Sequence, residues 1–229
     1  LTYSDPAFGA ASNCFVTDPE AYASDGSGGT TPATQARAYR RLKHDGAMHL
    51  LDANDYYGAP NTTNWLAFLA RYDSGDTAAR YGVELTPMAA DLPADRFFVG
   101  KPADSALWGL VASNGASAES TVSAVDGATA LLVAQIIHGP SDAAAHLWVN
   151  PALDVLPPAP NATLNGIPTF TFDKLALVAH RPGGAVPVVS LDEVRFGDTW
   201  EGVTSAIPEA GACTLIALAA AALARQRRA

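Results

Sequence analysis

The segment that decides the fold reads Asn61-Thr62-Thr63-Asn64-Trp65-Leu66-Ala67-Phe68-Leu69-Ala70-Arg71-Tyr72. Side chains of a β-strand alternate between two faces, so the residues from Trp65 to Arg71 at odd positions share one face and those from Leu66 to Tyr72 at even positions share the other. Both faces are largely apolar, which indicates a central strand that is covered on both sides. The turn residues Asp73-Ser74-Gly75 then end the strand.

Further strand candidates recur on both sides of this segment, separated by turn residues. They lie near Phe15-Val16 and at 36–42, 79–85, 96–100, 107–112, 121–124, 128–138, 146–150, 169–180 and 186–196. The proline-rich stretch 151–168 is predicted to be a loop. In the last strand, one face is predicted to carry Val188, Ser190, Asp192, Val194 and Phe196. Ten or more strands, with no helix before residue 199, predict an all-β fold of two antiparallel sheets, a sandwich or jelly roll.

Composition limits the class of protein. The 229 residues are enough for one domain with a full core, and the net charge of −9 with no basic patch argues against nucleic-acid binding. Few charges (16%) suit an exported β-protein. The chain begins with Leu1, which is consistent with removal of a signal peptide, and 1–33 is predicted to be an N-terminal strand and loop region before a domain at 34–203.

The C-terminus has three parts in a fixed order. A short motif, Ile207-Pro208-Glu209, is followed by an uncharged run at 210–224 and by a basic end with Arg225, Arg227 and Arg228. The apolar run includes Ala210, Cys213, Leu215, Ile216, Leu218, Leu223 and Ala224. This order predicts a short hydrophobic transmembrane helix with its basic end in the cytoplasm. Fifteen residues give only about 22 Å of helix against a hydrocarbon core of about 30 Å, which favours a transient anchor.

The 207–229 segment resembles the PEP-CTERM sorting signal of Gram-negative bacteria, in which Pro-Glu-Pro precedes a short membrane helix and a basic tail. Ala210 stands where the second proline of that motif would be. The resemblance implies an exosortase-type processing enzyme as partner, cleavage near the motif, and delivery to the cell envelope or the extracellular matrix.

A second resemblance covers about residues 35–203. The segments Leu107-Trp108-Gly109-Leu110, Leu147-Trp148-Val149-Asn150-Pro151 and Asp192-Glu193-Val194-Arg195-Phe196-Gly197-Asp198-Thr199-Trp200 are similar to those of LamG-like, concanavalin A-type jelly rolls. The resemblance implies two curved antiparallel sheets and, in relatives, carbohydrate or protein binding on the concave face.

No catalytic residues are predicted. The Asp192-Glu193 pair points to opposite faces of its strand, and Glu193 is expected to pair with Arg195 on the same face. Jelly-roll glycosidases need two carboxylates about 5–5.5 Å apart, and a Glu-x-Asp-x-x-Glu motif is absent from the sequence.

Metal sites receive little support from the spacing of candidate ligands. The five histidines lack a His-x-x-x-His spacing, although His138 and His146 flank a turn and could be cross-strand neighbours in a zinc site. Asp52, Asn54 and Asp55 are acidic and close, but they do not follow the EF-hand pattern. No cofactor is predicted. Calcium binding is left as an alternative, with no ligands assigned.

The tryptophans Trp65, Trp108, Trp148 and Trp200 could stack on sugars, but apolar neighbours favour a place in the core. The sequence therefore predicts an exported, non-catalytic bacterial surface or matrix protein that binds carbohydrate or serves structurally. The alternative is a glycan hydrolase or lyase on the same fold.

Overall fold

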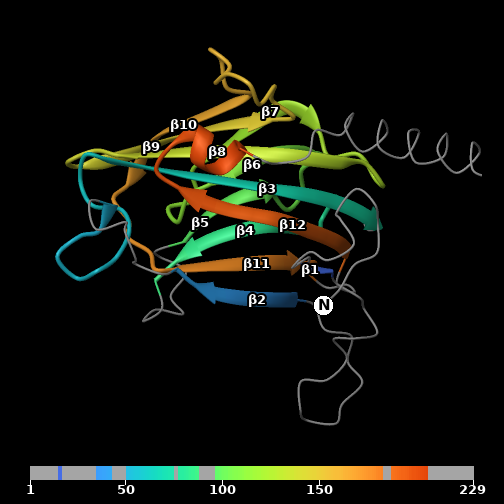
Figure 1. The fold of residues 1–229 in the computed structure, drawn as a ribbon. Coiled ribbons are helices and arrows are strands. Elements are labelled where there is room, and N and C mark those ends of the chain that lie inside the picture. The colour runs from blue at the N-terminus through green and yellow to red at the C-terminus, as the bar shows by residue number, and fades with distance from the viewer. Residues whose placement is uncertain are drawn as a thin grey trace, which may run out of the picture.

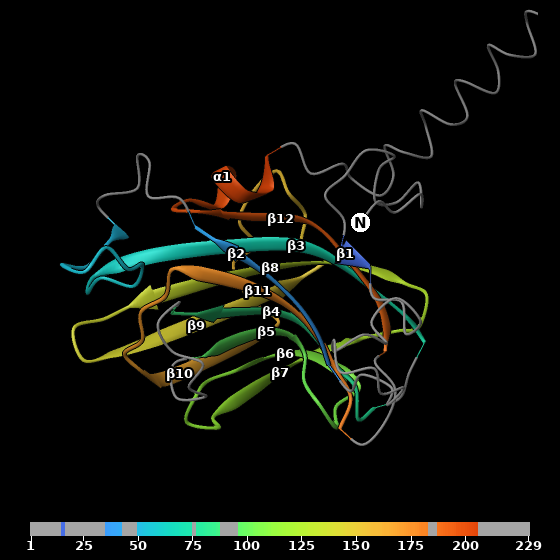
Figure 2. The ribbon, with the colours of Figure 1, turned by 90° about the horizontal axis from the view of Figure 1, so that it is seen from below.

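The computed structural model describes residues 15–16, 35–42, 50–74, 77–87, 96–182 and 187–205. Within these residues twelve β-strands form two layers (Figures 1 and 2). The strands are β1 (Phe15–Val16), β2 (Gln35–Arg41), β3 (Thr62–Ser74), β4 (Arg80–Thr86), β5 (Phe97–Lys101), β6 (Leu107–Val111), β7 (Ser117–Ser123), β8 (Thr129–His138), β9 (Asp142–Val149), β10 (Ala162–Pro168), β11 (Lys174–His180) and β12 (Val188–Gly197). One short helix, α1 (Trp200–Thr204), follows β12.

Each layer is a six-stranded antiparallel sheet. We call sheet A the one ordered β1-β12-β3-β8-β9-β10 and sheet B the one ordered β2-β11-β4-β5-β6-β7. Strands β4 to β7 follow one another within sheet B and β8 to β10 within sheet A, whereas the chain crosses between the layers elsewhere, as between β11 in sheet B and β12 in sheet A. The predicted all-β, two-sheet jelly-roll sandwich is confirmed.

Strand β3 is central in sheet A, as its two apolar faces predict. Its even-numbered residues, from Leu66 to Tyr72, face sheet B and join the main core. Its odd-numbered residues Trp65, Ala67 and Leu69 face away from sheet B and form a second apolar cluster. Fully burying one large apolar side chain contributes roughly 1.5–3 kcal/mol, so both faces of β3 stabilise the fold.

Helix α1 covers the second cluster on the outside of sheet A (Figure 2). Thr199 caps its start, because the Thr199 side-chain oxygen accepts a hydrogen bond from the Gly202 backbone N–H at 3.0 Å. Arg195 of β12 donates a hydrogen bond to the Ser205 carbonyl at the other end of the helix. The start of this one-turn helix is therefore capped by its own N-terminal residue, and its end is tied to β12 through Arg195.

The predicted single face of the last strand is wrong, because β12 contains a bulge. Asp192 lies opposite Leu69 while Arg195 lies opposite Ala67, so two residues of β12 oppose one of β3. Glu193 takes a φ of +50° at this point. A bulge of this kind reverses the alternation. As a result Val194 and Phe196 pack against the main core, while Ser190 and Asp192 lie on the other face of the sheet.

Two strand boundaries after residue 150 also differ from the prediction. The end of the predicted loop 151–168 is strand β10, which pairs with β9 at the edge of sheet A. Pro168 is tolerated there because an edge strand does not need every N–H for pairing. The predicted strand 169–180 begins only at β11, since the chain first crosses between the layers through the buried residues Phe170 and Phe172.

His138, at the end of β8, is enclosed by aromatic rings in the main core. It is 3% exposed, and its ring centroid lies 5.2 Å from that of Phe170 and 6.3 Å from that of Phe172. Tyr57 stacks on Phe172 at 5.8 Å. Desolvation by burial lowers the pKa of His138 from its ordinary 6.5 to about 4.

The predicted C-terminal membrane segment, 210–224, lies outside the described residues. Among the residues that the structure does describe, there is no helix of the length and hydropathy needed to cross a bilayer.

The buried His138 predicts a pH dependence of stability. Since its pKa is about 6.5 in the unfolded chain and about 4 in the folded one, only the unfolded chain binds this proton between those pH values. The free energy of unfolding therefore has its full value above pH 6.5 and decreases as the pH drops from 6.5 to 4. Denaturant unfolding of the wild type and His138→Phe at pH 7 and pH 4 should show an extra loss of about 3 kcal/mol in the wild type. Equal losses in the two proteins would contradict the prediction.

Candidate functional site

A cleft of about 450 Å³ lies on the outer face of sheet B, the face turned away from sheet A. Residues of β4, β6 and β7, the β6–β7 turn and residues on either side of β5 line it. Tyr81, Val83 and Leu85 of β4 point into the core, so Arg80, Gly82 and Glu84 point outward. The same alternation turns Val111 of β6 and Ser117 and Glu119 of β7 toward the cleft.

Strand register arranges the outward residues in two rows that run across the strands. The first row is Gly82, Gly100, Gly109 and Glu119; the second is Glu84, Phe98, Val111 and Ser117. Three strand spacings of about 4.8 Å make each row about 14 Å long. The first row consists of glycines up to Glu119, and these three glycines are buried beneath the residues around them. We call it the glycine row.

The glycines are required by close backbone approach. A Cβ on Gly82 would lie 2.2 Å from the Val99 carbonyl oxygen, and one on Gly100 would lie 2.3 Å from the Tyr81 oxygen. A Cβ on Gly109 would lie 2.8 Å from the Ala118 oxygen. Gly82 and Gly100 also have φ values of +153° and +154°, which L side chains rarely adopt. Side chains are therefore excluded from the glycine row by steric necessity.

Arg80 closes the β4 end of the cleft. Its guanidinium carbon lies 4.0 Å from the Phe98 ring centroid, and its Nη2 lies 2.8 Å from Glu84 Oε1. In most strands, the side chain at position 82 would stand between those of Arg80 and Glu84. Because that residue is Gly82, the arginine can lie flat along the strand and reach the carboxylate. The Glu84 side chain is only 1% exposed, so this ion pair is largely desolvated.

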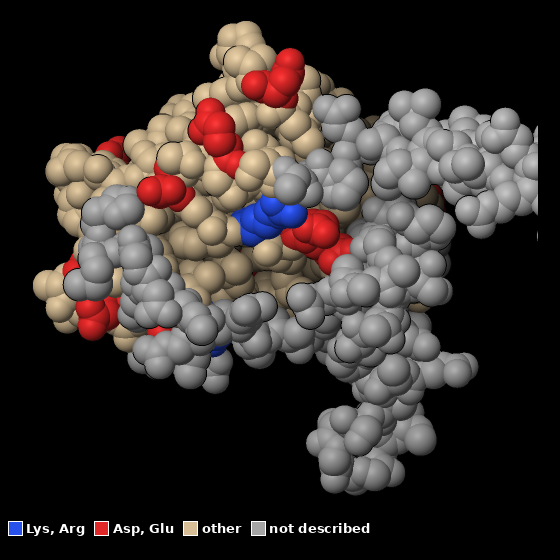
Figure 3. Space-filling model, viewed as in Figure 1, with Lys and Arg blue, Asp and Glu red and all other residues tan. Residues whose placement is uncertain are grey.

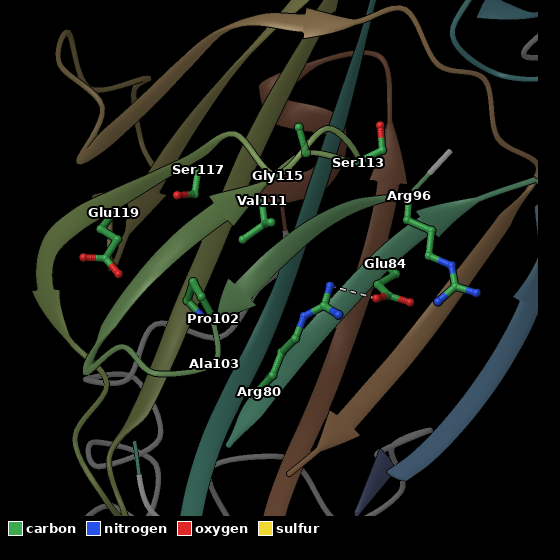
Figure 4. A pocket seen from close by; sticks show the side chains of 11 residues that line it. Arg80, Glu84, Arg96, Pro102, Ala103, Val111, Ser113, Gly115, Ser117 and Glu119 are labelled. Atoms are coloured by element: carbon green, nitrogen blue, oxygen red, sulfur yellow. Dashed lines mark ion pairs between the residues drawn. The ribbon is translucent and has the colours of Figure 1, made fainter. Parts of the chain in front are cut away.

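Figure 4 shows the arrangement of the charged groups. Arg80 and Arg96 are drawn on either side of Glu84, whereas Glu119 and Ser117 come from β7 at the opposite end. Glu119 is exposed. The cleft thus presents the guanidinium groups of Arg80 and Arg96 and the carboxylate of Glu119, and such groups can donate to and accept from the hydroxyls of a polar ligand.

The four tryptophans lie in the interior, as their apolar neighbours predict. Trp65, Trp148 and Trp200 form the second cluster, with Trp65 and Trp148 stacked at 5.6 Å and Trp200 at right angles to both. Trp108 is 1% exposed in the main core. None of the four can present a ring face to a sugar in this arrangement.

The histidine zinc hypothesis is wrong. His138 lies opposite Thr62 and Ala143 and faces the core, whereas His146 pairs with Gln135 on the outer face and contacts Thr163 Oγ1 at 3.1 Å. The two rings are therefore on opposite sides of sheet A. The described part of the chain contains no group of three or more His, Cys, Asp or Glu side chains that could hold a metal.

The acidic loop around Asp52 uses its carboxylate internally. Asp52 Oδ1 accepts hydrogen bonds from the backbone N–H groups of Asn54 at 2.8 Å and Tyr56 at 3.0 Å. Asp55 takes a φ of +63° in the same turn. This is the geometry of an Asx turn, in which the carboxylate organises the loop.

The predicted ion pair of β12 is confirmed. Glu193 Oε2 accepts a hydrogen bond from Arg195 Nη2 at 2.9 Å. Asp192 Oδ1 accepts from the Glu193 N–H at 2.7 Å, so the Asp192 side chain supports the bulge. The sorting motif Ile207-Pro208-Glu209, the membrane segment and the basic tail Arg225, Arg227 and Arg228 lie outside the described residues.

The sequence did not single out the residues of the cleft. A signal was present in β4, where Arg80, Gly82 and Glu84 alternate with buried apolar residues. The glycines Gly100 and Gly109 come from other strands, however, and their alignment with Gly82 follows only from the register.

Comparison with known proteins gives weak likenesses. No protein-family model matches the sequence, and no curated protein matches it. Among solved structures, a bifunctional GH43-CE protein of Bacteroides eggerthii superposes with a TM-score of 0.42 and 11% identity, over 72% of this chain and 22% of that one. The endo-1,3-beta-glucanase of Streptomyces sioyaensis gives 0.41 and 8%, over 70% and 74%. A heptameric SAP-like pentraxin of Limulus polyphemus gives 0.40 and 10%, over 66% and 77%.

Gly100→Ala should destabilise the domain by about 3–5 kcal/mol, because it adds a backbone clash to an unfavourable φ. The matched control is Gly115→Ala in the β6–β7 turn, where φ is +83° but a Cβ would meet nothing within 4 Å. The control should cost only about 1–2 kcal/mol. Urea unfolding followed by tryptophan fluorescence measures both, and similar costs would refute the steric account of the glycine row.

Proposed function

We propose that this chain is an exported bacterial surface or matrix protein that binds carbohydrate without catalysis, and that the cleft of sheet B is its binding site. The proposal is carried by one observation. Charged side chains from both ends of the sheet, those of Arg80, Arg96 and Glu119, line one cleft, and Arg80 is already oriented by Phe98 and Glu84. A preorganised site loses less side-chain entropy on binding.

The chemistry of the cleft favours a neutral glycan. Sugar hydroxyls both donate and accept hydrogen bonds, and the cleft offers donors on Arg80 and Arg96 and an acceptor on Glu119, while the buried Glu84 orients Arg80. These four charges balance one another, whereas the whole chain carries −9. On the face seen in Figure 3 the acidic side chains are scattered and basic ones are sparse. Such a surface repels polyanions, including nucleic acids and strongly acidic polysaccharides.

The placement of the carboxylates supports binding over hydrolysis. Glu84 and Glu119 come from strands three positions apart and from different rows, so their backbones are more than about 14 Å from each other. A retaining glycosidase needs its carboxyl groups about 5–5.5 Å apart, and an inverting one about 6.5–9.5 Å apart. Glu84 is also held by Arg80. A hydrolase or lyase is the alternative, and the shared presence of two carboxylates in one cleft is the observation that keeps it open.

The destination of the protein follows from the C-terminal resemblance. In this proposal Ile207, Pro208 and Glu209 form the recognition motif of an exosortase-type enzyme, the segment 210–224 anchors the chain transiently in the membrane, and Arg225, Arg227 and Arg228 stay in the cytoplasm. The sandwich then lies outside the cytoplasm, where a glycan-binding surface meets envelope or matrix polysaccharide.

The full chain should bind a subset of neutral glycans on an array, with and without calcium. Glu119→Gln should weaken binding by about ten- to a hundredfold, since hydrogen bonds to a charged group contribute roughly 1.5–3 kcal/mol. Titration calorimetry with the best glycan measures the change.

The control for this experiment is Glu193→Gln, which removes a carboxylate from the outer face of sheet A and should leave affinity unchanged. If Glu119→Gln leaves the binding affinity unchanged, the cleft is not the binding site. Release of new reducing ends from the bound glycan, lost in Glu119→Gln, would establish the enzymatic alternative instead.

The sorting proposal is tested by the mass of the mature product in a host with an exosortase. The wild type should end near Ile207, whereas Pro208→Ala should retain the intact Arg tail because the motif is damaged. Glu201→Ala, in α1 just upstream, should be processed normally. An intact tail in the wild type contradicts the proposal.

A further inference from the structure

The edge strand β10 contains an Asn-Gly pair, Asn165-Gly166, at a bulge. Leu164 lies opposite Ala145 and Ile167 opposite Ala143, so the pair opposes the single residue Ala144. Gly166 has a φ of +65°, and both residues of the pair are exposed. The hydrogen-bond ladder is interrupted at such a bulge.

We propose that Asn165 is a site of spontaneous backbone-assisted deamidation in the folded protein. The Gly166 backbone nitrogen, after losing its proton to water or hydroxide, attacks the side-chain carbonyl carbon of Asn165. A carbon–nitrogen bond forms and closes a five-membered imide, the bond from that carbon to Nδ2 breaks, and ammonia leaves. Water then opens the imide at either carbonyl, which leaves an aspartyl or an isoaspartyl residue at position 165. The net reaction consumes one water and releases one ammonia.

The surroundings of the pair favour this reaction. Glycine has no Cβ to obstruct the approach of its nitrogen, and even a Cβ built on Gly166 would meet nothing within 4 Å. Within the part of the chain that the structure describes, the Asn165 side chain has no hydrogen-bond partner that would hold its carbonyl away. The reacting groups can therefore reorient without giving up other contacts.

The second Asn-Gly pair, Asn114-Gly115, is a matched comparison within the same chain. It lies in the β6–β7 turn at the rim of the cleft. Here both reacting groups are already engaged. Asn114 Oδ1 accepts from the Ala116 N–H at 3.0 Å, and the Gly115 N–H donates to the Ala112 carbonyl at 3.0 Å. Imide formation at Asn114 must break both hydrogen bonds, so it should be the slower site.

Conversion changes the edge of sheet A. It places a new negative charge on β10, which lies at the end of the strand order with one side unpaired. A charged side chain on an edge strand opposes pairing with another strand. The isoaspartyl product also adds a backbone atom to the bulge, where the ladder is already interrupted. This inference is independent of the proposed glycan site.

The test is peptide mapping by mass spectrometry after incubating the full chain at pH 7 and pH 9. The Asn165 peptide should gain the mass of amide-to-acid conversion about tenfold faster than the Asn114 peptide, since two hydrogen bonds must be broken at Asn114. Conversion should be faster at pH 9. Asn165→Gln should abolish it at this peptide, because its longer side chain does not form the five-membered imide, and should leave the Asn114 peptide unchanged.

An unfolded control identifies the cause of any difference. In urea the two Asn-Gly peptides should convert at similar rates, because the contacts that distinguish them are gone. A native protein in which Asn114 converts as fast as Asn165 or faster overturns the proposal. So does a native Asn165 peptide that stays unchanged while the urea sample converts.

Discussion

The structure depends on the need to bury both faces of β3. One face meets the opposite sheet, as in any sandwich. The other carries Trp65, Ala67 and Leu69, which water would otherwise reach, and it is covered by Trp148, by Trp200 and by the helix that follows β12. A sandwich of two sheets has only one interior, so this third apolar layer is an addition to the basic fold. It explains why a helix of one turn is present and why it is capped at both ends.

The two sheets have outer faces of opposite character. Aromatic rings pack on the outer face of sheet A. On the outer face of sheet B, part of the surface consists of glycines, which have no side chains. Where Gly82 and Gly100 face each other across β4 and β5, the backbones leave no room for a Cβ. Since position 82 carries no side chain, Arg80 can lie on Phe98 and reach Glu84. The same glycines thus allow a close approach of two strands and a desolvated ion pair beside the cleft.

Local patterns predicted most of the fold and little of the site. The strands could be predicted because alternation and turn residues are properties of short segments, as in 61–72. The bulge at Glu193 could not, because a non-glycine residue at positive φ gives no compositional signal. Strand β10 was not predicted, because Gly166 and Pro168 are unusual in strands. An edge position tolerates both residues. The cleft needs the register of four strands to bring Gly82, Gly100, Gly109 and Glu119 into line, and register is set by tertiary pairing.

The connection from β12 to α1 has a mechanical consequence. Ser205 follows α1 and is the last described residue, so tension applied at Ser205 enters the domain through α1. The Arg195 contact to the Ser205 carbonyl and the packing of Trp200 and Val203 take that load first. Behind them, β12 is paired along its length with the central strand β3. A pull on the C-terminal side is therefore expected to unfold this one-turn helix first. It exposes three tryptophans before it reaches the strands of the sandwich.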